Sequence, residues 1–247
     1  MKVVFLGATK GIGRALARRM IAAGHELYLL GRDVEDLGKS ARDLEVHGAQ
    51  TAGTVGCAAC DLATPASFGP ALDAADRTLG AFDAVVVTGG MFAPQAELES
   101  DPEFTERMLT VNFTGTVLFC EEARKRMLAR GGGTLCVLSS VAGERGRKPV
   151  ILYGASKAGL SRYLEGLDHK FRAQGLRVVT VKPGFVKTGM TAGLQPPPFA
   201  GEPEGVAESI LAAMVRGKPV VYTPSAWAMV MFVIRLLPRF VMRRIGF

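Results

Sequence analysis

The feature that most constrains the fold is a glycine-rich turn close to the start of the chain. The apolar run 3–6 leads directly into Gly7, and Gly11 and Gly13 complete a G-x-x-x-G-x-G spacing. Apolar residues at helical spacing follow from Ile12 to Met20, so the glycines stand between a strand and a helix. Side chains in such a turn would keep the backbone away from a pyrophosphate, whereas the helix N-terminus offers free N–H groups and a positive dipole end. This strand–turn–helix context predicts a dinucleotide-binding site.

The rest of the chain continues this alternation of strands and helices. Strands are expected at 3–6, 26–30, 55–60, 83–87, 134–138, 177–181 and 220–222, and helices at 11–23, 33–48, 65–79, 101–129, 152–174 and 204–216. Continuously apolar strands between helices predict a parallel sheet that is covered on both faces. We therefore expect an α/β fold, a single-domain Rossmann-type doubly wound parallel sheet of about seven strands over residues 1–224, with a C-terminal amphipathic helical extension over 225–247. The length of 247 residues and the hydrophobic fraction of 48% suit one such domain.

Two segments interrupt this regular pattern. Gly69-Pro70 falls within the helix expected at 65–79 and could break it. Residues 184–203 contain Pro196-Pro197-Pro198 and show no periodicity. A long irregular stretch inside a compact domain is usually a lid or a binding loop, so this segment is expected to border a ligand.

The end of the second expected strand bears on which nicotinamide cofactor binds. An NAD enzyme usually places an acid there to hold the ribose hydroxyls. Here the strand ends at Arg32, whose guanidinium can form paired charge-assisted bonds to a 2′-phosphate. Lys10 adds a second positive charge from the glycine loop, whereas Asp33, one residue late, is the argument for NAD. Two cations against one displaced acid favour NADP(H).

Tyr153 and Lys157 are the candidate proton-transfer pair. They stand at i and i+4, so they share one face of the helix expected at 152–174. A free tyrosine has a pKa of about 10, and a nearby ammonium favours the phenolate, so Lys157 is expected to lower the Tyr153 pKa toward working pH. The pair would then act as a general acid/base.

Further polar residues follow the carboxyl ends of the expected strands. Ser140 comes after strand 134–138, Asp61 after strand 55–60, and Pro183-Gly184 after strand 177–181, while Asn112 lies in the helix expected at 101–129. Open α/β sheets bind their ligands at this edge, so these residues are expected to meet there.

In this combination and order, the chain resembles the short-chain dehydrogenase/reductase family over nearly its whole length. The resemblance implies that Tyr153 protonates the carbonyl oxygen, that Ser140 (rather than Ser139) hydrogen-bonds it, that Lys157 holds the nicotinamide ribose and that Asn112 orders a water. It also implies that Asp61 contacts the adenine and Thr188 the carboxamide. The expected catalytic residues are Asn112, Ser140, Tyr153 and Lys157. The expected cofactor-binding residues are Gly7, Thr9, Lys10, Gly11, Ile12, Gly13, Arg32, Asp61, Leu62, Gly89, Tyr153, Lys157, Pro183, Gly184, Val186 and Thr188.

One motif departs from the family pattern. The family usually has N-N-A-G after the fourth strand, and Val87-Thr88-Gly89-Gly90 stands there in this chain. The two amides that brace the sheet are absent, so we expect reduced local rigidity at this point.

The cysteines and the charge exclude some functions. Cys57 and Cys60 have C-x-x-C spacing, but no second cysteine pair or paired histidines complete a zinc site, so we expect structural thiols and no metal. The net charge is +7, and no acidic residue follows Glu208. Nucleic-acid binding is not expected, because the basic C-terminal segment is embedded in apolar residues. With no signal sequence before the first strand, a cytoplasmic location is expected.

The C-terminal segment 225–247 is apolar on two sides. Its expected helix, interrupted at Pro238, has one stripe of Trp227, Val230, Met231, Ile234, Leu237 and Val241 and another of Met229, Phe232, Val233, Leu236 and Phe240. A row of Arg235, Arg239 and Arg243 breaks this apolar surface. One interpretation is an interfacial helix on an anionic membrane, peripheral at its inner face. The other is a helix packed over the substrate pocket or in a subunit contact, and both can hold together.

The segment from about 141 onward is also similar to one branch of the family, that of the decaprenylphosphoryl-2-keto-ribose reductase. The similarity is carried by Ala142-Gly-Glu-Arg145, Tyr153-Gly, Lys157-Ala-Gly-Leu160 and Pro238-Arg239. It implies a ketone on a hydrophobic or lipid-linked substrate, reduced with NADPH, and the family resemblance implies a homodimer or homotetramer. Two alternatives stay open: a soluble 3-ketoacyl or polyketide-type ketoreductase, and a non-catalytic cofactor-binding scaffold.

Overall fold

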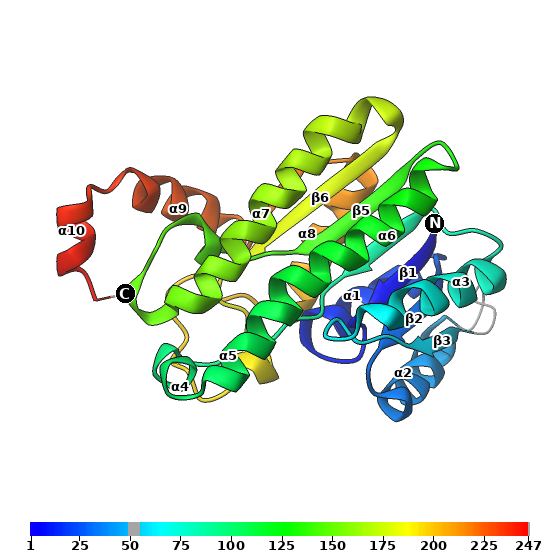
Figure 1. Cartoon of the computed structure of the whole chain (residues 1–247), viewed down its shortest axis with the longest axis horizontal. Coiled ribbons are helices and arrows are strands. Elements are labelled where there is room, and N and C mark those ends of the chain that lie inside the picture. Colours follow the sequence, from blue (N-terminus) through cyan, green and yellow to red (C-terminus); the bar gives the residue numbers. More distant parts are fainter. Residues whose placement is uncertain (49–54, 247) are drawn as a thin grey trace.

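The computed structural model describes residues 1–48 and 55–246, and its core is a parallel sheet of seven strands in the order β3-β2-β1-β4-β5-β6-β7 (Figure 1). The strands are β1 (Lys2–Leu6), β2 (Glu26–Gly31), β3 (Gly56–Ala59), β4 (Ala84–Val87), β5 (Gly133–Leu138), β6 (Leu176–Pro183) and β7 (Val220–Thr223). The expected doubly wound sheet is therefore confirmed. The order reverses at β1 and β4, and the cleft outside the carboxyl ends of these two strands is where such sheets bind ligands.

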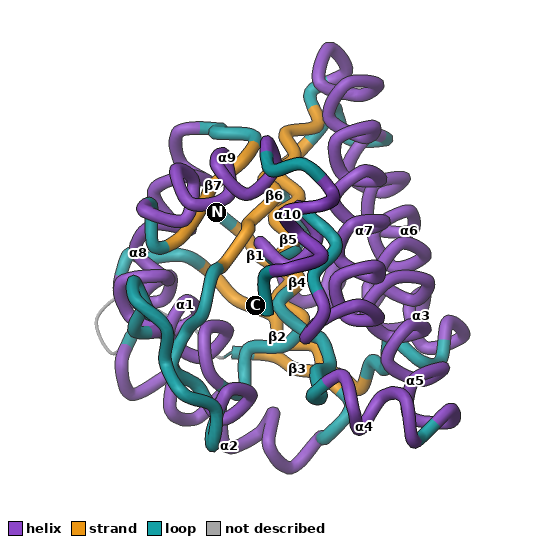
Figure 2. Tube along the Cα trace, turned by 90° about the vertical axis from the view of Figure 1, so that its left-hand side faces the viewer, coloured by secondary structure: helices purple, strands orange, loops and turns teal. Residues whose placement is uncertain are grey.

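Helices cover both faces of the sheet (Figure 2). One face carries α1 (Gly11–Ala22), α2 (Val34–His47) and α8 (Pro203–Arg216), and the other carries α3 (Phe68–Leu79), α6 (Thr116–Leu128) and α7 (Ile151–Phe171). Side chains alternate between the faces along each strand. Val3 and Phe5 of β1 pack with the first set of helices, whereas Val4 and Leu6 pack with the second. This alternation explains why the strands are apolar at every position.

Shorter helices gather beyond the carboxyl ends of the strands (Figure 1). They are α4 (Gln95–Ser100), α5 (Pro102–Leu109), α9 (Ala226–Leu236), α10 (Arg239–Arg244), the π-helical turn η2 (Thr110–Gly115) and the 3₁₀ turns η1 (Pro65–Ser67), η3 (Val141–Glu144), η4 (Lys148–Val150) and η6 (Gly189–Thr191). One further 3₁₀ turn, η5 (Arg172–Gln174), lies at the opposite edge, between α7 and the start of β6. No helix within residues 1–48 and 55–246 has the length and apolar character needed to cross a bilayer.

The single helix expected at 101–129 is wrong in two respects. It is divided into α5, η2 and α6, because the backbone shifts to π-type hydrogen bonding at residues 110–115. An additional helix, α4, precedes it and ends at Asp101, whose carboxylate then caps α5 by accepting from the Phe104 N–H at 2.9 Å. The interruption expected at Gly69-Pro70 is also absent, since Pro70 lies in the first turn of α3, where a missing N–H costs nothing.

The cysteines are all free in this fold. Burial raises the pKa of the Cys60 thiol to about 11, which makes it unreactive at neutral pH. In the described part of the chain, no group of three or more potential metal ligands occurs.

Candidate active site

The glycine loop is packed too tightly for any side chain. Gly7 has a φ of +98°, and a Cβ added to it would lie 2.6 Å from the Gly89 nitrogen. A Cβ on Gly13 would lie 2.1 Å from the Gly7 carbonyl oxygen. The loop therefore presents bare backbone and the N-terminus of α1 to the switch point of the sheet, which fits a pyrophosphate.

Thr88 braces this loop in place of the amides that the family pattern has there. Its hydroxyl donates to the Gly7 carbonyl at 2.9 Å, and its backbone N–H donates to the Leu6 carbonyl at 2.9 Å. One threonine thus ties β4 to β1 at the position where the family pattern has asparagine.

Charged side chains gather at the end of β2. Arg32 is exposed and forms no ion pair among the described residues, whereas Lys10 pairs with Asp36 at 3.2 Å. Asp33, the argument for NAD, is the N-cap of α2 and accepts the Asp36 N–H at 3.0 Å. Its carboxylate is therefore engaged by the helix, and a guanidinium remains free at the position that distinguishes the two cofactors.

The remaining expected cofactor residues line the same edge of the sheet. Thr188 lies across the glycine loop, since a Cβ on Gly11 would be 3.2 Å from its Cγ2. Leu62 borders Gly89, whose added Cβ would lie 3.5 Å from its Cδ1. Asp61 accepts the Ala63 N–H at 2.9 Å in the turn after β3. The others are Thr9 and Ile12 at the start of α1, Pro183 and Gly184 at the end of β6, and Val186 just beyond it.

The irregular segment after β6 is a closed loop. Val186 and Gly201 form an isolated parallel bridge, and the Lys187 N–H donates to the Gly201 carbonyl at 2.9 Å. Between these ends the loop lines a pocket of about 490 Å³, which includes Phe185, Thr188 and Leu194. The expected binding loop thus has its ends pinned beside the cofactor edge.

Tyr153, Ser140 and Lys157 come together where η3 packs on α7. Lys157 Nζ lies 5.9 Å from the centroid of the Tyr153 ring and donates to the Leu138 carbonyl at 3.1 Å. Ser140 is buried at the end of β5 and interacts with the Tyr153 side chain. Ser139 points elsewhere, because its hydroxyl donates to the Lys157 carbonyl at 3.0 Å and meets the Ser161 hydroxyl at 2.7 Å. The structure therefore places Ser140, and not its neighbour, beside the tyrosine.

Burial dominates the electrostatics of this group. It raises the pKa of Tyr153 to about 12, and the interaction with Ser140 opposes this only in part. It lowers the pKa of Lys157 to about 8, because the buried ammonium loses its hydration. The expectation that Lys157 lowers the tyrosine pKa is not met in this geometry, since desolvation is the larger effect. Tyr153 is consequently a neutral phenol at physiological pH and can donate a proton.

Asn112 lies fully buried in the π-helical turn η2, and its side-chain amide both accepts and donates a hydrogen bond. Its Oδ1 accepts the Met91 N–H at 2.7 Å, and its Nδ2 donates to the Met91 carbonyl at 2.8 Å. A Cβ on Gly90 would lie 3.2 Å from Asn112 Oδ1 and 3.6 Å from Lys157 Nζ. Asn112 therefore holds the loop after β4 beside the lysine, in a π-type turn of the sort that recurs at functional sites.

Two residues near Tyr153 were missed from the sequence. Phe92 packs edge-to-face on the Tyr153 ring, with centroids 5.1 Å apart at 87°. Gln95 Oε1 accepts the Leu152 N–H at 3.1 Å and so fixes the first turn of α7. Both lie in the segment between β4 and α5, where no periodic pattern in the sequence indicates α4. The one available signal was Asp101-Pro102, which is typical of a helix start and marks the beginning of α5.

Comparison with known proteins shows the family of this chain. The short chain dehydrogenase family model matches residues 1–198. An uncharacterized oxidoreductase of Mycobacterium tuberculosis is 36% identical over 242 residues, which cover 98% of this chain and 96% of that protein. Carbonyl reductase family member 4 of Danio rerio is 32% identical over 219 residues, which cover 85% of this chain and 89% of that protein.

A solved structure agrees in fold. A variant of actinorhodin polyketide ketoreductase, solved with NADPH, superposes with a TM-score of 0.79 over 90% of this chain and 95% of that one, at 23% identity. Its fold therefore matches without indicating a shared substrate. With the glycine cradle at the switch point and the Ser140, Tyr153 and Lys157 cluster beside it, the chain belongs to the short-chain dehydrogenase family, oxidoreductases whose fold binds a nicotinamide cofactor.

Proposed function

We propose that this protein is an NADPH-dependent ketoreductase that acts on a hydrophobic, lipid-linked ketone. The observation that carries the proposal is the position of Tyr153, half-buried beside Ser140 and with Lys157 Nζ 5.9 Å from the centroid of its ring. Reduction of a carbonyl needs a group that is protonated before the reaction and close to the oxygen. A tyrosine with a pKa of about 12 meets the first requirement, and its place at the carboxyl edge of the sheet meets the second.

Each residue of the cluster has a distinct part in this proposal. The reduced nicotinamide, when bound, supplies the hydride that reaches the carbonyl carbon. Tyr153 gives its phenolic proton to the carbonyl oxygen, so that the ketone becomes an alcohol. Ser140 hydrogen-bonds the same oxygen and stabilises the negative charge that develops there. Lys157 stabilises the resulting phenolate with its positive charge until a proton from water restores the phenol, while Asn112 keeps the loop after β4 in place.

The preference for NADPH rests on the end of β2. Arg32 is free to meet a 2′-phosphate, and Lys10 lies nearby in the glycine loop. Asp33 is turned into its own helix as an N-cap. An NAD-type contact to the ribose would have to break that cap, which would cost about 1 kcal/mol.

The substrate class rests on the surroundings of Tyr153. Phe92 contacts its ring, and Phe185 and Leu194 line the pocket of the loop that follows β6. The relative from Danio rerio carries the name of a carbonyl reductase, which supports a ketone as the reacting group. The similarity of residues 141–247 to the decaprenylphosphoryl-2-keto-ribose reductase branch supports a lipid-linked one.

The direct test is NADPH oxidation with two sets of ketones. A small water-soluble ketone measures the chemistry itself, and a polyprenyl-linked ketone in mild detergent measures the substrate class. A catalytic efficiency at least tenfold higher for the lipid-linked ketone is expected. Equal use of both would favour the soluble 3-ketoacyl or polyketide-type alternative. Cofactor binding with no turnover of any ketone would favour the scaffold alternative.

We also propose that the protein forms a homodimer or homotetramer through α5, α6 and α7. Phe113, Leu118 and Ile151 are exposed apolar side chains on this surface. Light scattering should show at least a dimer, and Leu118→Asp should shift it toward monomer. A monomer in the unsubstituted protein would contradict this part of the proposal.

A further inference from the structure

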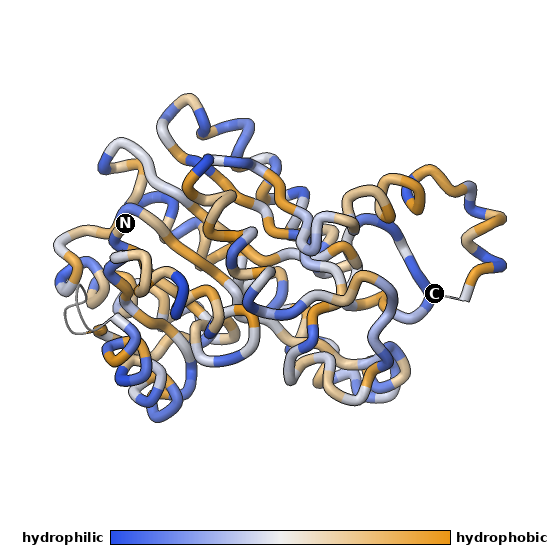
Figure 3. The backbone as a smooth tube through the Cα atoms, turned by 180° about the vertical axis from the view of Figure 1, so that it is seen from behind, coloured by the Kyte–Doolittle hydropathy of each residue, from blue (hydrophilic) through white to orange (hydrophobic). Residues whose placement is uncertain are grey.

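The C-terminal helices α9 and α10 form an arm with two apolar sides, of which one is buried and the other is exposed. Trp227, Met231 and Ile234 are buried against Val141 and Phe185. The opposite side stays exposed, and we call it the outer face: Met229, Phe232, Val233, Leu236 and Phe240. Phe232 is 57% exposed and Leu236 is 68% exposed. Figure 3 shows these apolar turns extending beyond the body of the molecule.

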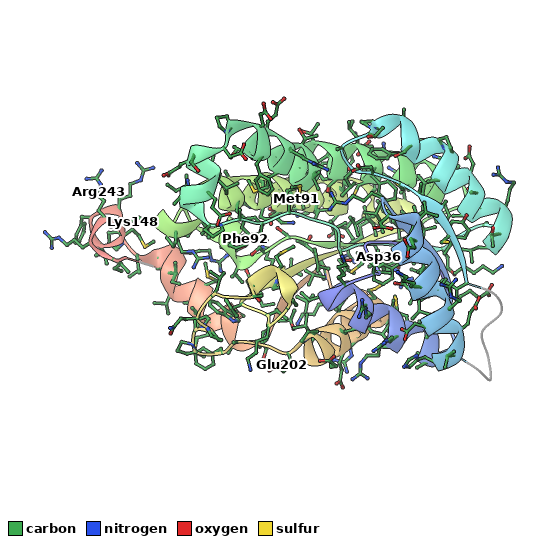
Figure 4. The ribbon with its side chains drawn as sticks, turned by 90° about the horizontal axis from the view of Figure 1, so that it is seen from below. Asp36, Met91, Phe92, Lys148, Glu202 and Arg243 are labelled. Atoms are coloured by element: carbon green, nitrogen blue, oxygen red, sulfur yellow. The ribbon has the colours of Figure 1, made fainter. Side chains whose placement is uncertain are left out.

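The arm is fastened to the site by specific contacts. Trp227 Nε1 donates to the Phe199 carbonyl at 3.0 Å, and its ring lies so close to Gly184 that an added Cβ would be 2.1 Å from that nitrogen. Arg145 donates to the Leu237 carbonyl at 2.7 Å. Lys148, labelled beside Arg243 in Figure 4, donates to the Arg243 carbonyl at 2.7 Å. The outer face is therefore held in a fixed orientation, and Trp227 links it to the loop that lines the pocket.

Arg235 also holds the arm to the rest of the protein. Its guanidinium lies 3.1 Å from Glu144 Oε2, and Glu144 is also bound by Lys182 at 2.5 Å and by the Tyr222 hydroxyl at 3.1 Å. The sequence interpretation that grouped Arg235 with the outer arginines is wrong on this point. A buried carboxylate holds it to the protein.

The other arginines of the arm carry uncompensated charge. Arg239, Arg243 and Arg244 are exposed, and within residues 225–246 only Arg235 forms an ion pair. No acidic residue occurs after Glu208, and exposed Lys148 adds a further positive charge next to Arg243. The outer face is thus apolar and flanked at α10 by cations.

We propose that the outer face docks on an anionic lipid bilayer. Apolar side chains at α9 would enter the acyl boundary, and Arg239, Arg243 and Arg244 would meet the headgroup phosphates. A helix spanning Ala226–Leu236 is too short to cross a bilayer, so the attachment is peripheral. A second copy of the chain fits less well, because a two-fold contact on this face would bring both sets of arginines together.

This docking deepens the proposed function, because it presents the site to a ketone carried by the membrane. The arm, the 187–200 loop and the η3–η4 segment before Tyr153 all lie beyond the carboxyl edge of the sheet (Figure 1). A bilayer in contact with the outer face would lie against the same end of the molecule as the pocket. A lipid-borne ketone then reaches Tyr153 without entering bulk water.

The test is co-sedimentation of the full chain with vesicles of phosphatidylcholine alone or with phosphatidylglycerol. Binding to the anionic vesicles at low salt is expected, with at least tenfold weaker binding to phosphatidylcholine and in high salt. The variant Phe232→Ser/Leu236→Ser should lose binding at least tenfold. Its matched control is Val46→Ser/Val215→Ser, which removes equally exposed apolar groups from α2 and α8 and should bind like the unsubstituted protein.

A charge variant separates a local contact from the overall positive charge. Arg239→Gln/Arg243→Gln/Arg244→Gln should lose binding at least tenfold, whereas Arg42→Gln/Arg216→Gln/Lys218→Gln, with the same change in net charge, should not. The single tryptophan, Trp227, lies on the buried side of the arm, so an unchanged emission spectrum shows that each variant keeps the arm packed on the protein. Reduction of a water-soluble ketone should be unaffected in all four variants, which keeps a failure of docking distinct from a failure of the reductase proposal.

Two results would overturn the docking. One is equal binding of all variants and controls to anionic vesicles, since the attraction would then be non-specific. The other is a smaller oligomer for Phe232→Ser/Leu236→Ser without lipid, together with no vesicle binding by the unsubstituted protein. The outer face would then be a contact between copies of the chain.

Discussion

The cluster around Tyr153 and the C-terminal arm lie at the same end of the molecule, yet polar groups are buried in the first and apolar groups are exposed in the second. In the cluster, Ser140, Asn112 and Lys157 are buried with polar partners. In the arm, large apolar side chains face outward, as do arginines that form no ion pair with another described residue. Buried polar groups whose hydrogen bonds are all formed keep a fixed geometry. Exposed apolar side chains are unfavourable in water, and a partner that covers them removes this unfavourable contact. The difference separates a region organised for chemistry from one organised for contact.

Glu144 joins the two regions. It ends η3, the turn that starts at Ser140, and its carboxylate reaches β6, β7 and α9 through Lys182, Tyr222 and Arg235. Nearby positive charges hold the pKa of Glu144 below its usual value even though burial opposes this. The cluster and the arm are thus tied by one buried carboxylate, and a change there should affect both.

The largest effect is expected from Tyr153→Phe. The variant keeps the ring against Phe92 but removes the proton donor, so turnover should fall about 10³-fold. Cofactor affinity should stay within about threefold, because no cofactor contact is lost from the glycine loop. Steady-state kinetics and cofactor titration measure the two quantities. Turnover within tenfold of the unsubstituted enzyme would mean that another group delivers the proton.

Glu144→Gln should reduce stability by about 3 kcal/mol, because it leaves Lys182 partly buried without its counter-charge. The matched control is Glu208→Gln, whose pair with Arg19 is exposed, and it should change stability by less than about 0.5 kcal/mol. Urea unfolding followed by Trp227 emission measures both. Equal stability of the two variants would show that the contacts of Glu144 contribute no more to the free energy of unfolding than a surface ion pair does.

The same pair of variants has an expected pH dependence. The folded-state pKa of Glu144 is below its usual value of 4.5, so its ionic contribution is complete above that value. The contribution is lost as pH falls through the lower folded-state pKa. The stability difference between Glu144→Gln and the unsubstituted protein should therefore be constant from neutral pH down to about 5 and shrink in more acidic solution.

The comparison between cluster and arm also separates what could be predicted from sequence. The strand–helix alternation, the glycine loop and the meeting of Ser140, Tyr153 and Lys157 follow from local patterns, because parallel strands deliver their carboxyl ends to one edge. The two apolar stripes of the arm were visible as well. Which stripe is buried was not, because burial of Trp227 depends on Gly184 and Phe199, which are distant in the chain.

Two other features could not be predicted from sequence for the same reason. Thr88 braces the glycine loop through a contact with Gly7 on another strand, and no local pattern indicates it. The role of Asp33 was left open rather than mistaken: it was weighed as the argument for NAD and not adopted, and in the structure it caps α2. An aspartate before a helix suits either role, and only the conformation of the side chain distinguishes them.

A smaller effect is expected from Arg32→Ala. It removes the charge-assisted contacts proposed for the 2′-phosphate, so the preference for NADPH over NADH should fall by about 10- to 100-fold. The control is Arg42→Ala, which removes an exposed arginine from α2 and should leave the preference unchanged. The ratio of catalytic efficiencies for the two cofactors gives the answer. An unaltered ratio in Arg32→Ala would place cofactor discrimination elsewhere.

The smallest effect concerns the pH dependence of the cluster. Burial lowers the pKa of Lys157 to about 8, so its ammonium is present below that pH and is lost as pH rises through it. Tyr153, with its pKa raised to about 12, keeps its proton over the same range. If the ammonium supports proton return to the tyrosine, turnover in the reductive direction should be level below about pH 8. Above that value it should fall, by at most about tenfold per pH unit.

The position of the descending limb identifies the group that titrates, because the two values are well separated. A fall centred near 8 assigns it to Lys157, whereas turnover that stays level to about pH 10 would leave Tyr153 as the only titrating group in the cluster. The arm supplies a control for this measurement: Phe232→Ser changes an exposed side chain outside the cluster, so its profile with a water-soluble ketone should superpose on that of the unsubstituted enzyme. A displaced profile in Phe232→Ser would mean that the two regions are coupled more closely than their contrasting environments indicate, through Trp227 or Glu144.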